Sequence, residues 1–144
     1  MPRFEEHRTV TASPGTCWQL LTDPDRIPTW LTVASSVRAE GEVGAGQRLV
    51  ARGGALGVSV KVELEVVAWE PEERFAWRLR DPVRVEATHR LEVVEDGLTR
   101  VHVGVEADLG RRVPVRARFA IRVVRGEVAR SLDRFAELAE AVRD

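Results

Sequence analysis

The sequence is poor in the residues that bind metals or form covalent cross-links. Its 144 residues include one cysteine, three histidines and no tyrosine. The single cysteine, Cys17, excludes an internal disulfide. No group of cysteine, histidine and carboxylate residues has the spacing of a metal site, and neither a glycine-rich nucleotide loop nor a nucleophilic triad is visible. We therefore expect no metal and no bound cofactor.

The chain also lacks long apolar runs and an excess of one charge. Residues 1–6 contain no apolar core of a signal peptide, and no run is long enough for a membrane span. A cytoplasmic location is therefore the default expectation. The formal net charge is −1, whereas nucleic-acid binding needs a more basic chain with a stacking or groove-reading motif. What remains is an ordinary soluble composition, 44% hydrophobic, which we interpret as one domain spanning residues 1–144.

The longest regular pattern lies at the C-terminus, where apolar residues recur at the helical period from about Val113 to Val142. A helix of this length is not stable alone in water, so it needs a surface to lie on. The predicted apolar face consists of Ala117, Ala120, Ile121, Val124, Val128, Leu132, Phe135, Leu138, Ala139 and Val142. The predicted solvated face carries Asp133, Arg134, Glu137 and Glu140.

Most of the chain before this helix alternates between apolar and polar residues, as strands do. The clearest strand runs from Val58 to Trp69, and Asp96-Gly97 predicts a tight hairpin turn. Further strands are predicted over residues 3–12, 33–39, 47–52, 75–79, 85–93 and 101–107. Ser13-Pro14 predicts the start of a short helix, followed by a helical turn over residues 26–31 that Pro28 breaks. The predicted inner faces include Val33, Ser35 and Val37, then Val58, Val60, Val62, Leu64 and Val66, then Val85, Ala87, His89, Leu91 and Val93.

These elements predict the fold class. Successive strands joined by short turns pair antiparallel, and strands with one apolar face need a cover on that face. We therefore predict an α+β fold: a curved antiparallel sheet of six or seven strands around the long C-terminal helix, with two short helices after the first strand.

Charge is unevenly distributed along this chain. Residues 1–110 carry 13 basic and 18 acidic side chains, net −5, whereas residues 111–144 carry 9 and 5, net +4. Seven of the arginines crowd the start of the long helix, where they oppose the helix dipole. We expect acidic residues of the sheet or loops, or an anionic partner, to compensate them. They are Arg111, Arg112, Arg116, Arg118, Arg122, Arg125 and Arg130.

Six short motifs mark the turns and element starts along the whole chain. They are Ala12-Ser13-Pro14 with Trp18, Asp23-Pro24, Pro28-Thr29-Trp30, Gly44-Ala45-Gly46, Val66-Val67-Ala68-Trp69-Glu70-Pro71 and Asp96-Gly97-Leu98-Thr99-Arg100-Val101. In this order they resemble the START-like (SRPBCC) proteins, most closely the polyketide cyclase/dehydrase and lipid-transport branch. The resemblance implies a helix-grip fold with a deep cavity between sheet and long helix. It also implies hydrophobic ligands such as lipids, quinones, hormones or polyketides, and in some members cyclisation, aromatisation or dehydration.

One histidine is a candidate for chemistry. His7 lies in the first predicted strand and His102 is expected to face solvent, but strand parity places His89 among inward apolar residues. An imidazole there is either a hydrogen-bonded core residue or a general acid or base, or it orients a ligand carbonyl. On the inner faces only Ser35 is predicted to accompany it, and the charged residues whose strand parity is clear are expected to point outward. His89 is therefore a weak catalytic candidate.

The four tryptophans are expected to divide between core and cavity. Trp18 and Trp69 are predicted in the core, Trp77 in core or cavity wall, and Trp30 either in a pocket or gate or in simple packing. The residues predicted to line a ligand cavity are Trp30, Val62, Leu64, Trp77, His89, Val103, Phe119 and Ile121.

Three functions are consistent with this pattern. The first is binding of a hydrophobic small molecule in the cavity, and the second is a polyketide cyclase, aromatase or dehydratase in which His89 moves a proton. The third is a protein interaction module, because Val115, Phe119 and Val123 form a second apolar stripe on the long helix. That stripe is covered by short helices or loops, borders the cavity mouth, or joins a second subunit, so monomer and homodimer both remain open.

Overall fold

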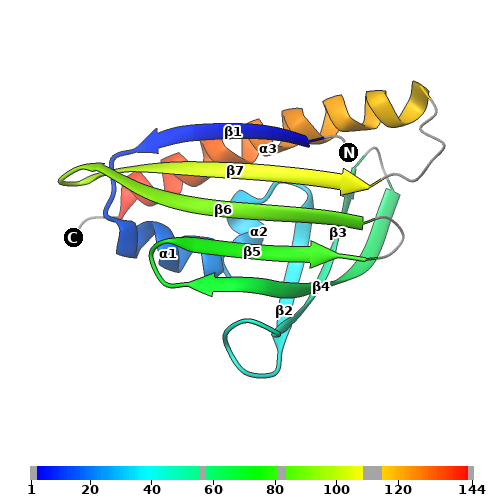
Figure 1. Ribbon diagram of the computed structural model, residues 1–144, viewed down its shortest axis with the longest axis horizontal. Coiled ribbons are helices and arrows are strands. Elements are labelled where there is room, and N and C mark those ends of the chain that lie inside the picture. The colour runs from blue at the N-terminus through cyan, green and yellow to red at the C-terminus, as the bar shows by residue number, and fades with distance from the viewer. Residues whose placement is uncertain (1–2, 56–57, 81–83, 109–114, 143–144) are drawn as a thin grey trace.

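The computed structural model describes residues 3–55, 58–80, 84–108 and 115–142, with the side chains of residues 55, 58 and 115–121 outside the description. Seven strands and three helices occur in these ranges (Figure 1). In chain order they are β1 Arg3–Val10, α1 Pro14–Thr22, α2 Ile27–Trp30, β2 Ala34–Glu40, β3 Arg48–Ala55, β4 Val58–Glu70, β5 Arg74–Leu79, β6 Arg84–Glu95, β7 Leu98–Asp108 and α3 Val115–Ala141.

All seven strands join one antiparallel sheet in the order β1-β7-β6-β5-β4-β3-β2. Consecutive strands from β2 to β7 are neighbours, as short turns require, and only β1 joins from the far end. The predicted hairpin at Asp96-Gly97 is confirmed: Gly97 has φ +78°, a conformation that glycine adopts without steric cost. The helices lie behind the sheet in the view of Figure 1. The predicted α+β helix-grip architecture is therefore confirmed.

The two short helices begin as their sequences predict. Ser13 is the N-cap of α1, where its hydroxyl accepts a hydrogen bond from the Thr16 backbone N–H at 3.2 Å, and Pro14 occupies the first turn. Pro28 also lies within the first turn of α2. The prediction that Pro28 breaks this turn was wrong, because a first-turn residue has no intrahelical N–H bond to lose.

Removing the Ser13 cap tests this account of α1. Ser13→Ala is expected to lower the free energy of unfolding by about 1 kcal/mol, since the Thr16 N–H loses its side-chain acceptor. Urea unfolding at neutral pH measures the change. Thr11→Ala, an exposed substitution just before the cap, serves as the control and should leave the stability nearly unchanged. Equal stability of Ser13→Ala and wild type would contradict the capping role.

The middle of α3 supplies the core as its periodicity predicts. Leu132, Phe135 and Ala139 are at most 5% exposed and belong to the central apolar cluster. The four residues predicted to be solvated, Asp133, Arg134, Glu137 and Glu140, are all exposed.

The ends of that face depart from the prediction. Val124 and Val142 are 45% and 46% exposed, because Val124 lies at a cavity rather than against packed side chains, and Val142 follows the last helical residue. Ala117, Ala120 and Ile121 lie outside the described side chains.

Two residues predicted on inner faces, Ser35 and Val93, are exposed in the structure. A register shift between Ala34 and Ser36 turns Ser35 outward, where its hydroxyl donates to the Arg52 carbonyl at 3.1 Å. The extra residue at this bulge inverts the side-chain alternation locally. Val93 keeps the predicted register opposite the buried Thr99 but is 59% exposed, near the hairpin at the end of β6. Ser35 is therefore not an inward polar partner for His89.

Intramolecular ion pairs compensate part of the basic helix. Arg125 of α3 pairs with Glu6 of β1 at 2.7 Å, and Arg8 of β1 pairs with Asp133 of α3. These exposed pairs contribute little stability each, but they connect α3 to the edge strand β1. The arginines at 111, 112, 116 and 118 lie outside the described side chains.

Candidate functional site

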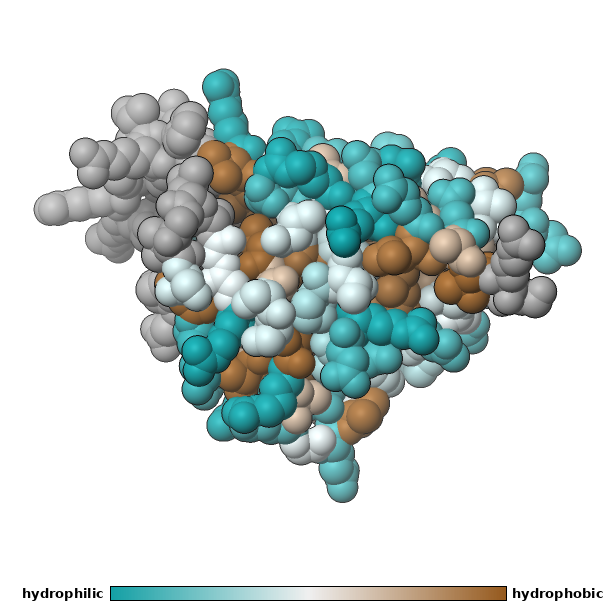
Figure 2. All heavy atoms as spheres, turned by 180° about the vertical axis from the view of Figure 1, so that it is seen from behind, coloured by the Kyte–Doolittle hydropathy of each residue, from teal (hydrophilic) through white to brown (hydrophobic). Residues whose placement is uncertain are grey.

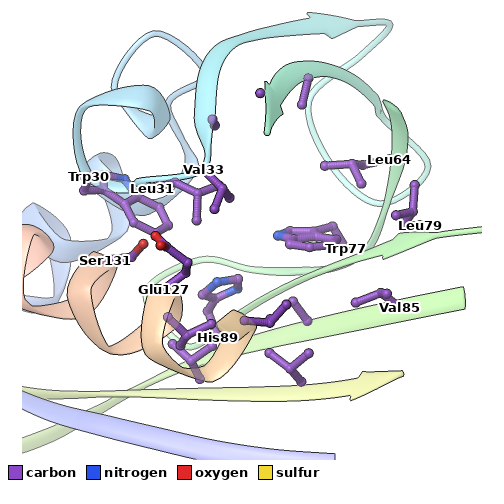
Figure 3. Close-up of a pocket in the computed structure, with 18 of the residues that line it drawn as sticks. Trp30, Leu31, Val33, Leu64, Trp77, Leu79, Val85, His89, Glu127 and Ser131 are labelled. Atoms are coloured by element: carbon purple, nitrogen blue, oxygen red, sulfur yellow. The ribbon is translucent and has the colours of Figure 1, made fainter. Parts of the chain in front are cut away.

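A cavity of about 440 Å³ lies between the concave face of the sheet and the helices α2 and α3. Figure 3 shows side chains from the strands and from both helices converging on it. Its volume falls within the range of small-molecule sites. Most of its wall is aliphatic or aromatic, because the inward residues of strands β3 to β7 are chiefly valine, leucine and alanine. This wall excludes polar solutes and accommodates an apolar molecule.

The structure brings together six of the eight residues predicted to line the cavity. Three are buried and three are half-buried, as expected of side chains that face an internal space. The six are Trp30, Val62, Leu64, Trp77, His89 and Val103. Phe119 and Ile121 lie in the part of α3 whose side chains are outside the described residues, so their place in the wall stays a prediction.

Trp30 is a fixed part of the wall. Its Nε1–H donates to the Leu20 carbonyl at 2.8 Å, and its ring packs edge-to-face against Phe135 at 5.3 Å and His89 at 6.3 Å. These three contacts fix the ring, so Trp30 is both a packed residue and part of the cavity wall, and it does not act as a movable gate. Trp18 and Trp69, predicted in the core, pack edge-to-face at 5.2 Å.

His89 projects into the cavity from β6 (Figure 3) and is 5% exposed. Its Nδ1 lies 3.1 Å from the Phe75 carbonyl oxygen. Since a carbonyl only accepts hydrogen bonds, Nδ1 carries the proton in this contact. Desolvation lowers the pKa of His89 to about 4, against a smaller raising effect of the Phe75 carbonyl. The ring is therefore neutral at pH 7, with Nε2 as an unprotonated acceptor.

One end of the cavity is polar, which the strand pattern did not predict. Glu127 and Ser131 of α3 lie there together beside Trp30 (Figure 3). The Thr32 hydroxyl donates to Glu127 Oε2 at 2.5 Å, and the Thr32 N–H donates to Ser131 Oγ at 3.1 Å. Arg130 also pairs with the Glu127 carboxylate. The expectation that charged residues point outward concerned residues of clear strand parity, so it did not cover Glu127 on α3.

The electrostatics of this end are anionic on the cavity side. Hydrogen bonds from Thr32 and then from Arg130 lower the pKa of Glu127, so the carboxylate is ionised at neutral pH. Its side chain is 24% exposed, whereas that of Arg130 is 60% exposed. Water therefore screens the cation more than the carboxylate.

The spacing of the apolar stripe of α3 could have predicted Glu127 and Ser131 as cavity residues from the sequence. Val123 lines the cavity. Of the three interpretations of the stripe, the one in which it borders the cavity is therefore correct for Val123. Continuing the spacing of four from Val123 leads to Glu127 and Ser131, which lie on the same side of the helix. From Val123 to Ser131, this side of α3 is therefore a cavity wall that changes from apolar to polar.

The cavity opens where two of its apolar residues reach solvent. Val60 of β4 is 50% exposed and Val124 of α3 is 45% exposed, although both line the cavity. Arg52, Gly53 and Gly54 of β3 complete this part of the lining. The face opposite to that of Figure 1 shows apolar side chains between the polar ones (Figure 2). An apolar ligand therefore meets an apolar rim as it enters.

Neither a metal site nor a membrane helix is found in the described part of the chain. Within it, no three histidine, cysteine or carboxylate residues gather as metal ligands would. No described helix combines the length and apolar composition needed to cross a membrane.

Comparison with known proteins places this geometry in a context. Residues 1–140 match the family model for polyketide cyclase / dehydrase and lipid transport. No curated protein sequence matches the chain.

Solved structures match over nearly the whole chain at low sequence identity. The Zhui aromatase/cyclase from Streptomyces sp. R1128 has a TM-score of 0.83 at 15% identity, over 96% of this chain and 93% of that one. Ara h 8.0201 has 0.75 at 17%, over 98% and 99%. The protein TTHA0849 from Thermus thermophilus has 0.76 at 22%, over 98% and 100%. At these identities the likeness shows the fold, and the activity has to be argued from the site.

Proposed function

The chain belongs to the polyketide cyclase / dehydrase and lipid transport family, and on that basis we propose that it binds a hydrophobic small molecule in the cavity under α3. The ligand would be a lipid, a quinone or a polyketide-like molecule. The observation that supports this most directly is the cavity of about 440 Å³ with a largely aliphatic and aromatic wall. A space of that size and lining binds an apolar molecule by the hydrophobic effect.

Native mass spectrometry tests the proposal. Freshly purified protein, and protein incubated with a lipid extract, are compared with the denatured mass. We expect a non-covalent adduct of a few hundred daltons, about the size that such a cavity holds, because an apolar ligand that is mostly shielded from water by this wall survives purification. Absence of an adduct in both preparations would contradict binding of this class. The native mass of the same sample also separates monomer from homodimer.

Catalysis is the second candidate, and His89 is the observation that favours it. The neutral imidazole is oriented by Phe75 and presents Nε2 to the cavity, which is the arrangement of a general base. A pKa of about 4 nevertheless makes this a weak base at neutral pH, since proton transfer is most efficient when the pKa lies near the working pH. Binding is therefore the function that the site supports better.

Replacing His89 by glutamine separates the two candidates. Glutamine retains an N–H that can donate to the Phe75 carbonyl but cannot act as a base. Loss of turnover of a poly-β-ketone substrate with retained ligand binding would support the enzyme. An unaltered product profile would exclude a catalytic role for His89.

A further inference from the structure

We propose that the cavity selects apolar ligands that carry a hydroxyl group, an alcohol or a phenol, over matched ethers, ketones and carboxylates. The inference rests on the proposed binding function and specifies the chemistry of the ligand: among the proposed classes it favours lipids and polyketide-like molecules that carry a hydroxyl over quinones, whose carbonyl oxygens only accept. It follows from counting which polar atoms of the described cavity wall already have hydrogen-bond partners and which remain available to a ligand.

The donor side of this count is short. The Trp30 Nε1–H is committed to the Leu20 carbonyl, and the His89 Nδ1–H to the Phe75 carbonyl. The Ser131 hydroxyl lies 3.2 Å from Thr32 Oγ1 and donates to it, because the Thr32 hydrogen goes to Glu127. Trp77 also lines the cavity, half-buried. Within the described residues its Nε1–H makes no hydrogen bond, and Figure 3 shows the nitrogen edge of the indole turned toward the centre of the cavity. Trp77 therefore offers a ligand one neutral donor.

The acceptor side is richer. His89 Nε2 has no hydrogen-bond partner among the described residues. The one fully enclosed side-chain atom without a partner in the described residues is Arg78 Nε, so His89 Nε2 keeps some accessible surface. Some of its surface therefore faces the cavity. The Glu127 carboxylate has lone pairs beyond those used by Thr32 and Arg130, because an ionised carboxylate accepts about four hydrogen bonds. Both atoms accept at neutral pH.

Register places the free donor beside a free acceptor. Trp77 pairs with Ala87, and Phe75 pairs with His89, across β5 and β6. Trp77 and His89 are therefore diagonal neighbours on the concave face, roughly 7–8 Å apart between their backbones. The indole and the imidazole flank the same part of the cavity, with Glu127 beyond His89 (Figure 3).

A hydroxyl is the small neutral group that satisfies this set. Its oxygen accepts from the Trp77 N–H, and its hydrogen is donated to His89 Nε2 or to Glu127. An ether or ketone oxygen accepts only, so the imidazole and carboxylate lose water without gaining a partner. A carboxylate ligand in addition meets the ionised Glu127. Arg52, the cation of the described wall, is exposed at the rim, where water screens its charge.

Isothermal titration calorimetry at pH 7 with four naphthalene compounds tests the inference. The probes are 2-naphthol, its methyl ether 2-methoxynaphthalene, ionised 2-naphthoate and naphthalene itself. We expect 2-naphthol to bind roughly tenfold more tightly than the ether, the effect of leaving buried acceptors unpaired. We expect 2-naphthoate to bind more weakly than the ether, because its charge is desolvated beside Glu127.

Two variants and a control locate the effect. Glu127→Gln should raise the affinity for 2-naphthoate by roughly tenfold or more, since the like charge is gone, while Glu137→Gln on the solvated face of the same helix should not. Trp77→Phe, which keeps an aromatic wall, should reduce the preference for 2-naphthol over naphthalene.

The outcomes are distinct. Equal affinities for all four compounds would agree with binding of apolar ligands in the cavity but would overturn hydroxyl selection. Tighter binding of the ether or of 2-naphthoate than of 2-naphthol would overturn it as well. If none of the four compounds binds, hydroxyl selection is overturned, and native mass spectrometry with the lipid extract decides separately whether the cavity binds an apolar ligand.

Discussion

Leu64→Asp is expected to abolish binding of an apolar ligand. Leu64 lines the cavity from the middle of β4, with Leu49 and Leu79 as its cross-strand neighbours on the same face. An aspartate there is solvated in the empty cavity but loses its water when an apolar ligand enters. Burying an unpaired carboxylate costs several kcal/mol, so we expect affinity for 2-naphthol to fall by roughly a hundredfold or more. Isothermal titration calorimetry measures the loss.

The control for this variant lies on the same strand. Lys61→Asp introduces the same side chain on the exposed face of β4 and is expected to leave the affinity unchanged. Urea unfolding of both variants establishes that they are folded before binding is compared. A folded Leu64→Asp protein with the affinity of wild type would show that Leu64 does not line the binding site.

Strand parity explains why so much of the cavity wall was predictable. Val62, Leu64, Trp77, His89 and Val103 all lie on strands whose alternation is unbroken over several residues. Because the side-chain period of a strand is two, placing one of them inside fixes the others. Partial burial of several of these residues reflects the cavity itself, which a sequence pattern does not distinguish from a filled core.

The failures of prediction have local physical causes. Ser35 lies at a β-bulge, and the sequence gives no sign of one there because the inserted residue is an ordinary one. Val93 keeps its register but lies at the end of β6 near the hairpin, where the alternation continues although the side chain is exposed. Neither error affected the prediction of the fold class, because it depends on the number and order of the strands. The predicted polar environment of His89 was wrong, because it depended on Ser35 alone.

The polar end of the cavity was missed for a different reason. Glu127 and Ser131 lie on a helix, where a surface residue and a cavity residue have the same spacing, so periodicity alone does not separate them. What distinguishes them is their contact with Thr32, 95 and 99 residues away in sequence. Such a contact is created by the packing of α3 against the end of α2 and is visible only in three dimensions.

The same polar atoms connect ligand choice with stability. An empty apolar cavity lowers stability because its lining atoms lack packing partners, and an unpaired imidazole nitrogen and a half-buried carboxylate add to that cost. A ligand that fills the space and pairs these groups recovers both contributions. Ligand binding is therefore expected to stabilise the protein, by an amount that grows with the ratio of ligand concentration to Kd.

His89 gives the fold a strong sensitivity to acid. Burial lowers the pKa of its imidazole from 6.5 to about 4 in the folded protein, while the unfolded chain keeps the ordinary value. Between these pH values the unfolded state binds more protons, so stability is complete above pH 6.5 and falls as the pH drops toward 4. The loss over this window is about 3 kcal/mol. Urea unfolding at several pH values between 7 and 4 measures it.

The variant His89→Gln isolates this contribution from that of the carboxylates. Glu127, whose pKa is also lowered, loses its stabilising charge at lower pH in both proteins, so its effect cancels in the comparison. Wild type is expected to lose about 3 kcal/mol more than His89→Gln between pH 7 and 4. Parallel stability curves would mean that the imidazole is as accessible to protons in the folded chain as in the unfolded one. The buried acceptor on which hydroxyl selection depends would then be absent.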